Sequence, residues 1–571
     1  MPRLFRTSLV CVFLMFFCAL FVSAKNDVLY IRVNSQEDFD KVTKSIDRGI
    51  QDGYSTIRVV FAKQVYYYKD AQINIGNKNC PDISLEIIGN NAIFRPVGTL
   101  MPQKGAKAAY KNGCSYLDVD GNDIYNYSKT YQADTLIEVL DDKAKTCRLY
   151  NEELKGMEGV DCTNAKIEIT TWYTRLTCNV QKFQDGYVYF VADKLEPGMG
   201  RYGNYNVNYD YTVCKLYPRF RFSGLSIDGC PFASDGASLV SRLDKPVYQC
   251  EESLFLQVIH STFKSVSMRD IKVQGNTSAC PLIIFNDNKV QSISVNNSEF
   301  SSIRAISIYG KATDNITVEN CYFHDNYAIC VMCENNCANS RVSYNKFERI
   351  GYLTNGFCIR VHGSNYQVDH NEISDFGYGA IAVGVTYMNT DQISPSYGVV
   401  ERNHIYHTSA FKANKASWTL EDSGAIYLFT RNDGAVVRYN YVHGIAGMHD
   451  NRGIYCDDGT TNCSVYGNIV MDIENSYGID LRKSLTLDNI KSGRSNVNNT
   501  IYDNIINNKL RFEGRGDDSS SHKGANLIVV GSDGEVPMMV TSSLVEDGAD
   551  KIVKYSTRKI ERKAKRMLRK K

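Results

Sequence analysis

The sequence predicts an all-β chain whose short parallel strands wind into a solenoid, and three observations carry this prediction. Apolar triplets recur from Ile306 to Leu481, Asn residues followed by a large apolar residue accompany them, and the period lies mostly in the twenties. Successive Asn residues stand 25, 26, 32, 37 and 28 positions apart. Such a repeat is typical of stacked coils in which polar turn residues form ladders. The six residues are Asn320, Asn345, Asn371, Asn403, Asn440 and Asn468. The alternative, a leucine-rich repeat, needs a Leu-x-x-Leu-x-Leu frame that the sequence lacks.

Residues 1–24 have the three parts of a signal peptide. Arg3 and Arg6 form a basic start, Leu9 to Val22 is an apolar run, and cleavage is expected after Ala24. An anchoring helix is the weaker interpretation, because the apolar run is shorter than the ~18–20 residues that span a bilayer. We therefore predict a secreted or periplasmic protein with no membrane span.

The residues after the signal peptide predict a cap for the open end of the solenoid. Ser35 and Asp38 form a capping box, and apolar residues follow at helical spacing from Phe39 to Ile50. One amphipathic helix at this place covers the backbone and apolar core that the first coil would otherwise expose. Residues 25–100 are interpreted as this N-terminal helical cap with the first coils.

Further along, the period disappears and then returns. Residues 101–215 contain strand-like runs without it, which indicates a small inserted or appended β subdomain. From Phe220 the coils are expected to resume, giving parallel repeats over residues 216–510. Residues 511–571 are interpreted as a C-terminal loop and a basic tail. A long segment before Glu421, with Trp418, suggests a binding wall.

Charge is spread unevenly along the chain. Lys551 to Lys571 holds eleven Lys or Arg and one Glu, a local charge of +10, so a total of +2 leaves the rest at −8. The part of the chain before Lys551 is therefore not a polyanion-binding surface overall. A solvated or docked terminal helix is favoured over nucleic-acid binding for the tail. No nucleic-acid partner is predicted, and a monomer is expected.

Cysteine usage agrees with export. Cys11 and Cys18 lie in the signal peptide, which leaves sixteen of the 18 Cys residues, an even number that permits disulfides. Cys330, Cys333 and Cys337 have a spacing that suggests a metal site, but a fourth ligand is missing. Stacked or disulfide-bonded cysteines are favoured there, and no metal is predicted.

The strand register predicts which side chains share the outer wall. If Ile306, Ile329, Ile359, Ile381, Ile426, Ile454 and Ile479 point inward, the next residue in each strand points outward. A second outward column follows two residues later. An outer face rich in Arg, His, Tyr, Phe and Asp favours a groove for a polar, ring-shaped ligand. The first column is Ser307, Cys330, Arg360, Ala382, Tyr427, Tyr455 and Asp480, and the second is Tyr309, Met332, His362, Gly384, Phe429, Asp457 and Arg482.

The motifs E-D-S-G-A-I-Y and G-I-Y-C-D-D-G, together with the Asn-x-Ile repeats, carry a resemblance to known proteins. Residues 220–510 resemble right-handed parallel β-helix (pectate-lyase-like) carbohydrate-active proteins, and most nearly the bacterial β-helix glycoside hydrolases of the fucosidase/xylanase type. The resemblance implies an active site on the outer face of one sheet with acidic residues from neighbouring coils. The matching positions are Asp422, Asp457 and Asp458. Many β-helix proteins share the scaffold, so the resemblance indicates fold more than activity.

Register geometry offers a separate test of the carboxyl pair that glycoside hydrolysis requires. Asp457 and Asp480 differ by one coil and two residues, so their Cα atoms should lie about 8 Å apart. Arg482, one coil on in the column of Asp457, would keep that carboxylate ionised as a base or nucleophile. Asp422 lies more than ~20 Å away along straight strands and joins the site only if the chain turns a corner after it. A plain turn is the favoured interpretation for Asp458.

These residues predict a carbohydrate-active enzyme that cleaves a polysaccharide and needs no cofactor. Two rivals stay open. A polysaccharide lyase acting on a uronate glycan would use Arg or Lys as base, often with calcium. A non-catalytic glycan-binding β-helix would hold the same ligand without cleaving it. The candidate substrate contacts are Arg482, Arg452, Arg360, His362, Phe429, Arg431 and Trp418.

Overall fold

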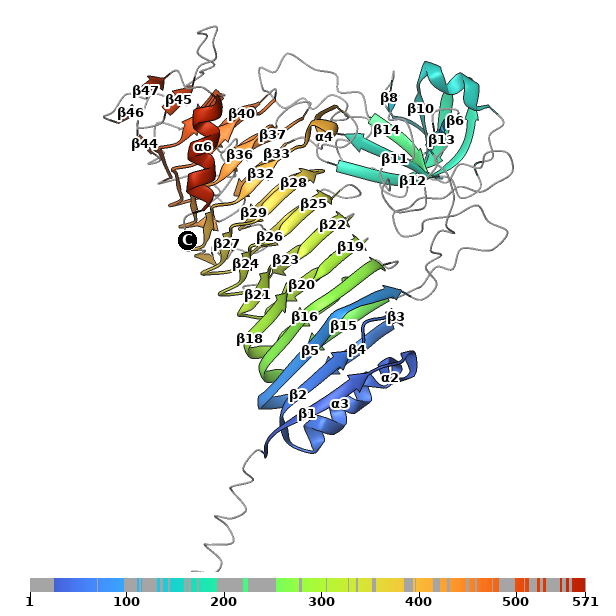
Figure 1. The fold of residues 1–571 in the computed structure, drawn as a ribbon. Coiled ribbons are helices and arrows are strands. Elements are labelled where there is room, and N and C mark those ends of the chain that lie inside the picture. Colours follow the sequence, from blue (N-terminus) through green and yellow to red (C-terminus); the bar gives the residue numbers. More distant parts are fainter. Residues whose placement is uncertain are drawn as a thin grey trace, which may run out of the picture.

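The structure is a computed structural model, shown in Figure 1. The residues that it describes are 25–68, 70–96, 110–111, 114–115, 131–133, 137–141, 144–158, 162, 166–171, 174–192, 219–223, 253–276, 280–303, 305–326, 328–334, 337–351, 356–384, 394–395, 397–413, 422–428, 432–447, 451–457, 460–474, 476–481, 499–507, 509–512, 521–523, 527–529, 545–546, 551–553 and 557–569. The predicted signal peptide, residues 1–24, lies outside them.

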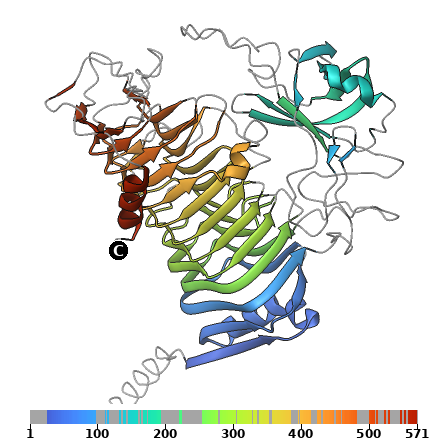
Figure 2. The same cartoon turned by 45° about the horizontal axis from the view of Figure 1, so that its top comes forward.

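Parallel strands stack in three faces around one continuous apolar core. Apart from the coils at the two ends, each coil contributes one strand to each face, and strands of successive coils pair in parallel. The long strands β5 and β16 run through two faces, and this joins those faces into one 25-stranded sheet. The third face is a separate 11-stranded sheet. Figures 1 and 2 show the resulting elongated stack.

The bounds of the strands follow the three faces. The first face comprises β1 (Lys25–Val33), β2 (Tyr54–Phe61), β5 (Asn79–Pro96), β16 (Thr262–Asn276), β18 (Lys289–Asn296), β21 (Ile316–Glu319), β24 (Arg341–Ser343), β27 (Gln367–Asp369), β31 (Val399–Glu401), β35 (Val436–Arg438), β38 (Ser464–Tyr466), β41 (Thr500–Tyr502), β44 (Ser521–Lys523) and β46 (Val545–Glu546). The second face comprises β3 (Val65–Tyr68), the later parts of β5 and β16, β19 (Glu299–Ile303), β22 (Tyr322–Asn326), β25 (Lys346–Ile350), β28 (Glu372–Phe376), β32 (His404–Tyr406), β36 (Tyr441–His443), β39 (Ile469–Met471), β42 (Ile505–Ile506), β45 (Leu527–Val529) and β47 (Lys551–Val553). The third face comprises β4 (Asp70–Gly76), β15 (Ser253–Ile259), β17 (Ile283–Asn286), β20 (Ile308–Lys311), β23 (Val331–Glu334), β26 (Phe357–Val361), β29 (Gly379–Val383), β33 (Ser423–Leu428), β37 (Asn451–Cys456), β40 (Tyr477–Leu481) and β43 (Lys509–Phe512).

Two short helices pack against the first coil, α2 (Gln36–Asp40) and α3 (Val42–Gln51). The Ser35 side chain accepts a hydrogen bond from the Asp38 backbone N–H, as a capping box requires. Phe39, Val42 and Ile46 are fully buried. The sequence predicted one continuous helix here, whereas the structure has a break at Lys41. Figure 1 shows both helices at the N-terminal end of the stack.

A seven-stranded antiparallel sheet with its own core interrupts the chain between β5 and β15. The last of its strands in the chain, β14 (Arg219–Ser223), pairs with β11 (Lys166–Thr171), so Phe220 to Ser223 belong to this sheet and do not restart the coils. The other five strands are β8 (Tyr131–Gln132), β9 (Glu138–Asp141), β10 (Thr146–Tyr150), β12 (Thr174–Gln184) and β13 (Tyr187–Val191). The coil ladder crosses this insertion without a gap, because β4 pairs with β15 and β5 pairs with β16.

The coils also extend beyond the predicted end at residue 510. β44 to β47 continue the first two faces, because each pairs in parallel with a strand of the preceding coil. The last helix, α6 (Thr557–Leu568), lies along the second face near its C-terminal end (Figure 1). Its Ile560 and Ala564 are buried against Ile469, Met471 and Ile505. None of the described helices has the length and apolar character that crossing a membrane requires.

A ladder of buried Asn side chains explains the repeat seen in the sequence. The ladder runs from Asn345 to Asn504. In it, each Asn Oδ1 accepts a hydrogen bond of 3.0–3.1 Å from the backbone N–H of the Asn one coil earlier. Each Nδ2 donates to a Val carbonyl of the preceding coil, as Asn403 does to Val368 at 2.9 Å. Asn320 is exposed and does not belong to the ladder; Cys321 takes that position and donates its N–H to Asn345.

Replacing Asn403 with Ala is expected to lower the free energy of unfolding by about 2–4 kcal/mol, because it leaves the Asn371 N–H and the Val368 carbonyl buried without their partner. The exposed Asn79, at the start of β5, is the matched control, and Asn79→Ala should change stability by less than about 0.5 kcal/mol. Chemical denaturation of the three proteins measures both effects. Equal stability of Asn403→Ala and wild type would show that the ladder is not stabilising.

A charged network on the outer side of the second face links successive coils. His324 contacts Asp325 at 2.6 Å and Glu299 at 3.3 Å, and Lys272 contacts Glu299 at 2.8 Å. Burial alone would lower the pKa of His324, but the hydrogen bonds to Asp325 and Glu299 outweigh burial and raise this pKa to about 9. The hydrogen bond from His324 lowers the pKa of Glu299 to about 2.

These shifts predict a loss of stability in alkaline solution. The folded-state pKa of His324, about 9, lies above the unfolded value of about 6.5, so the stabilisation is complete below pH ~6.5 and disappears as the pH rises through about 9. From pH ~6 to ~10 the wild type should lose on the order of 1–3 kcal/mol more than His324→Gln does. Urea unfolding of both proteins at the two pH values gives the difference, and parallel losses would contradict the assignment.

Candidate active site

The third face contains the inward-pointing column of isoleucines that the sequence predicted for the later coils. Ile359, Ile381, Ile426, Ile454 and Ile479 pair in register and are fully buried. The adjoining column is therefore Arg360, Ala382, Tyr427, Tyr455 and Asp480. Asp480 pairs with Tyr455, so it lies one coil on and two residues back from Asp457, as the register predicted.

The earlier part of both predicted columns is wrong by two residues. Val331 and Ile308, not Ile329 and Ile306, align with Ile359. Tyr309 and Met332 therefore share the column of Arg360, and the predicted members Ser307 and Cys330 are fully buried. A shift of two residues leaves the inward and outward alternation unchanged, which is why the sequence pattern did not reveal it.

A buried ion pair lies beneath the candidate site. The Arg452 Nε contacts Asp480 Oδ2 at 2.8 Å, and both side chains are 0% exposed. The guanidinium of Arg452 also donates from Nη1 to Asp422 Oδ1 at 3.0 Å and lies 4.0 Å from the Tyr455 ring centroid. One Arg therefore joins two carboxylates, one from the coil before its own and one from the coil after it. Because the Asp480 side chain is buried, it does not face a substrate as the predicted pairing with Asp457 required.

Asp422 reaches this ion pair because the chain turns at that residue. Its φ is +57°, in the left-handed region, directly before β33 begins at Ser423. Asp tolerates this conformation better than most residues. The corner brings the Asp422 carboxylate to Arg452 and to the Tyr455 hydroxyl, 3.5 Å away, and leaves its side chain 23% exposed. The chain thus turns the corner that the sequence analysis required for Asp422 to join the site.

Two tyrosines connect the remaining carboxylate to this cluster. Tyr427 and Tyr455 are paired neighbours on β33 and β37, with ring centroids 5.0 Å apart. The Tyr427 hydroxyl donates to Asp457 Oδ2 at 2.7 Å. Burial, followed by the nearby Asp457 carboxylate, raises the pKa of Tyr427 well above its ordinary value, so the phenol stays protonated and keeps donating. The Tyr pair thus lies between Asp422 and Asp457.

Close packing of the coils makes this arrangement possible. Gly424 at the start of the G-A-I-Y strand lies so near Tyr455 that a Cβ there would approach the Tyr455 Cβ to 2.8 Å. Phe357 stacks on Tyr427 with centroids 5.6 Å apart and meets Tyr378 edge-on. The Tyr378 hydroxyl donates to the Asp422 carbonyl at 3.0 Å. Aromatic rings from four successive coils therefore gather beside the carboxylates.

Arg360 and His362 belong to a second polar cluster on the same face. Arg360 forms an ion pair with Glu334 at 3.2 Å, and the Tyr309 hydroxyl donates to Glu334 at 3.1 Å. Burial, with the Glu334 carboxylate, raises the pKa of Tyr309 to about 12. Burial, with the neighbouring Arg360, lowers the pKa of His362. β26, which carries Arg360, is two coils before β33, and β20 and β23, which carry Tyr309 and Glu334, lie further back.

Five predicted site residues lie outside the described residues, so the structure does not place them. They are Asp458, Arg482, Phe429, Arg431 and Trp418. Sequence reasoning singled out neither the two tyrosines nor Glu334 as site residues. Tyr427 and Tyr455 stood in the predicted outward column beside Asp480, and this position was the signal that could have identified them.

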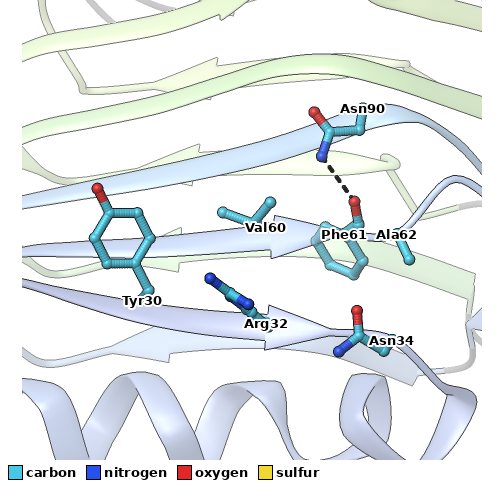
Figure 3. A pocket seen from close by; sticks show the side chains of 7 residues that line it. All are labelled: Tyr30, Arg32, Asn34, Val60, Phe61, Ala62 and Asn90. Carbon is cyan, nitrogen blue, oxygen red and sulfur yellow. Dashed lines mark hydrogen bonds between the residues drawn. The ribbon is translucent and has the colours of Figure 1, made fainter.

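The cysteine cluster and a surface hollow lie apart from the carboxylates. Cys330, Cys333 and Cys337 are buried in the core, and within the described ranges no group of three or more His, Cys, Asp or Glu is arranged to hold a metal ion. A hollow of about 380 Å³ lies over the first coils, and Figure 3 shows the side chains that line it. Its lining, which includes Tyr30, Arg32 and Asn90, contains no carboxylate, so the chemistry of paired acids belongs to the third face instead.

Comparisons with known proteins give no family for this chain and only distant structural similarities. The sequence matches no protein-family model and no curated protein. A solved "Glycoside hydrolase" is similar over 82% of this chain and 96% of its own, with 11% identity and a TM-score of 0.49. The complex of XylC with xylose is similar over 90% and 86%, with 9% identity and a TM-score of 0.38. An alginate lyase, AlyF-OU02 with G6, is similar over 53% and 80%, with 10% identity and a TM-score of 0.26. Similarities of this degree do not assign an activity.

Proposed function

We propose that the protein is an exported enzyme that cleaves glycosidic bonds of a polysaccharide on the third face of the coil. The observation that carries the proposal is the gathering of Asp422 and Asp457 around the Tyr427–Tyr455 pair, with Arg452 behind them. Glycoside hydrolysis uses two carboxyls, one to protonate the leaving oxygen and one to activate water or attack the sugar. Aromatic rings beside them suit the apolar face of a sugar ring.

The surroundings of the two carboxyls suggest a division of labour. Arg452 places a cation beside Asp422, which is the environment that a base or nucleophile requires. Asp457 accepts a hydrogen bond from the neutral phenol of Tyr427 and borders the aromatic group, and we assign it the role of proton donor. This assignment reverses the sequence-based one, which made Asp457 the base on account of Arg482. Asp480 acts through Arg452 and is a positioning residue rather than a catalytic one.

The lyase alternative is less well supported by the same contacts. A lyase needs a base that reaches the proton beside a uronate carboxylate. Arg452, one of its candidate bases, is fully buried and held by two carboxylates. The non-catalytic alternative predicts binding of a glycan without cleavage.

A screen of the mature protein against plant and host polysaccharides, with and without a chelator, tests the proposal. Hydrolysis should release new reducing ends without any rise in ultraviolet absorbance, and the chelator should have no effect. A calcium-dependent absorbance rise from an unsaturated product would establish a lyase. Binding of a glycan that is never cleaved would establish the non-catalytic alternative.

A further inference from the structure

The helix α6 is held against the coil by one face only. Ile560 and Ala564 are buried against Ile469, Met471 and Ile505, and Met567 packs at the edge of this cluster. The helix is therefore docked through its apolar stripe, as an amphipathic helix on a protein surface usually is. This leaves the opposite face of the helix outside the core of the protein.

That opposite face carries a concentrated positive charge, which we call the α6 basic face. Successive residues of a helix are about 100° apart, so its members cover an arc of about 160° opposite Ile560 and Ala564. From Arg562 to Arg569 the charges extend over about 10 Å along the axis. The face consists of Arg562, Lys563, Lys565, Arg566 and Arg569, all exposed.

The protein itself does not neutralise this charge. Over the described parts of the chain, none of the five cations has an ion-pair partner, and Glu561 is the acidic residue exposed beside them on α6. Residues 551–571 hold a local charge of +10, against −8 for the rest of the chain. Clustered unpaired cations raise the local concentration of a polyanion and its association rate.

We propose that the α6 basic face binds a linear anionic polysaccharide, at a site separate from the carboxylates of the third face. Charge complementarity supplies the attraction. A membrane surface fits less well, because the apolar side that would enter the lipid is already buried against the coil. Single-stranded nucleic acid fits less well, because the exposed face offers no aromatic ring for base stacking. Export, which the N-terminal sequence predicts, would bring the protein into contact with extracellular glycans.

The test uses the mature full-length chain and fluorescein-labelled heparin as the anionic glycan. Fluorescence anisotropy between about 50 and 300 mM salt should show binding that weakens steeply as salt rises. Changing Arg562, Lys563, Lys565, Arg566 and Arg569 to Gln should weaken binding at least about tenfold at low salt and flatten the salt dependence. Gln has nearly the helix propensity of Lys and Arg, so α6 should persist.

Two control variants show whether a loss of binding comes from the α6 basic face, from the lower total charge or from unfolding of α6. Changing the exposed Arg32, Lys44, Lys63, Lys264 and Lys289 to Gln removes the same charge from the N-terminal coils, and should alter affinity by less than about twofold. Exchanging Lys for Arg and Arg for Lys at the five α6 positions should preserve binding. Absence of heparin binding, equal loss in both charge-removal variants, loss in the charge-preserving variant, or tighter binding to duplex DNA or phosphatidylserine vesicles would overturn the proposal. Because no cleavage is measured, the result is independent of the proposed glycosidase activity.

Discussion

Asp422→Asn and Asp457→Asn are each expected to lower kcat by about 10²–10⁴-fold on the polysaccharide that the screen identifies, since each removes a carboxyl from the proposed pair. Both changes preserve side-chain size, and neither residue belongs to the apolar core. The melting temperature of Asp457→Asn should therefore stay close to that of the wild type. That of Asp422→Asn should fall, because the change neutralises one of the two anionic partners of the buried Arg452, so its kcat is measured at a temperature at which the variant is folded.

The control for this prediction is Asp287→Asn. Asp287 is an exposed carboxylate that contacts His260 far from the third-face cluster. Its replacement should leave kcat and KM unchanged. The division of labour adds a sharper readout in truncated variants: azide, which fits the space that a removed carboxylate leaves, should restore turnover to Asp422→Ala but not to Asp457→Ala. Wild-type turnover in both site variants would remove the proposed active site.

Asp480→Leu is expected to lower the free energy of unfolding by about 3–5 kcal/mol. Asp480 and Arg452 are both fully buried and form the ion pair beneath the site. Removing the carboxylate leaves the guanidinium without one of its two anionic partners in a low-dielectric interior. Urea denaturation with matched spectroscopic probes measures the loss.

A double variant shows whether the effect comes from the unpaired charge. Arg452→Met combined with Asp480→Leu replaces both ions with apolar side chains, and should recover most of the stability lost in Asp480→Leu. Activity should not recover, because Asp422 loses its contact with Arg452 in the double variant. A loss below about 1 kcal/mol in Asp480→Leu would show that the ion pair is not structurally important.

The sequence predicted the stacking of the coils well, because the repeated Asn residues are the ones that form hydrogen bonds from coil to coil. From Asn345 onward, the spacing of the Asn residues identified a ladder whose hydrogen bonds fix one coil to the next. Asn320 was included wrongly, because Asn also favours the left-handed turn positions beside the ladder, and its φ is +53°. The columns at Ile306 and Ile329 were wrong by two residues for another reason: a shift of two residues leaves the inward and outward alternation unchanged.

The candidate site was less predictable because the register gives the direction of a side chain and not its depth. Asp480 stood correctly in the outward column, yet its side chain is buried under Arg452. Arg452 shares the parity of the inward Ile454, so alternation alone did not suggest that it reaches a carboxylate of the outward column. Asp422 could be placed only conditionally, since the corner depends on one backbone angle.

The insertion between β5 and β15 has a consequence for how the molecule can be rebuilt. Strands β5 and β16 pair as directly as any two successive coils, with Ile87 beside Met268 and Phe94 beside Val273. The antiparallel sheet contributes no rung to that ladder and has a core of its own. The chain is therefore modular at this point: the inserted unit can be excised, or exchanged for a foreign domain, through a short splice, while the winding that supports Asp422 and Asp457 stays complete.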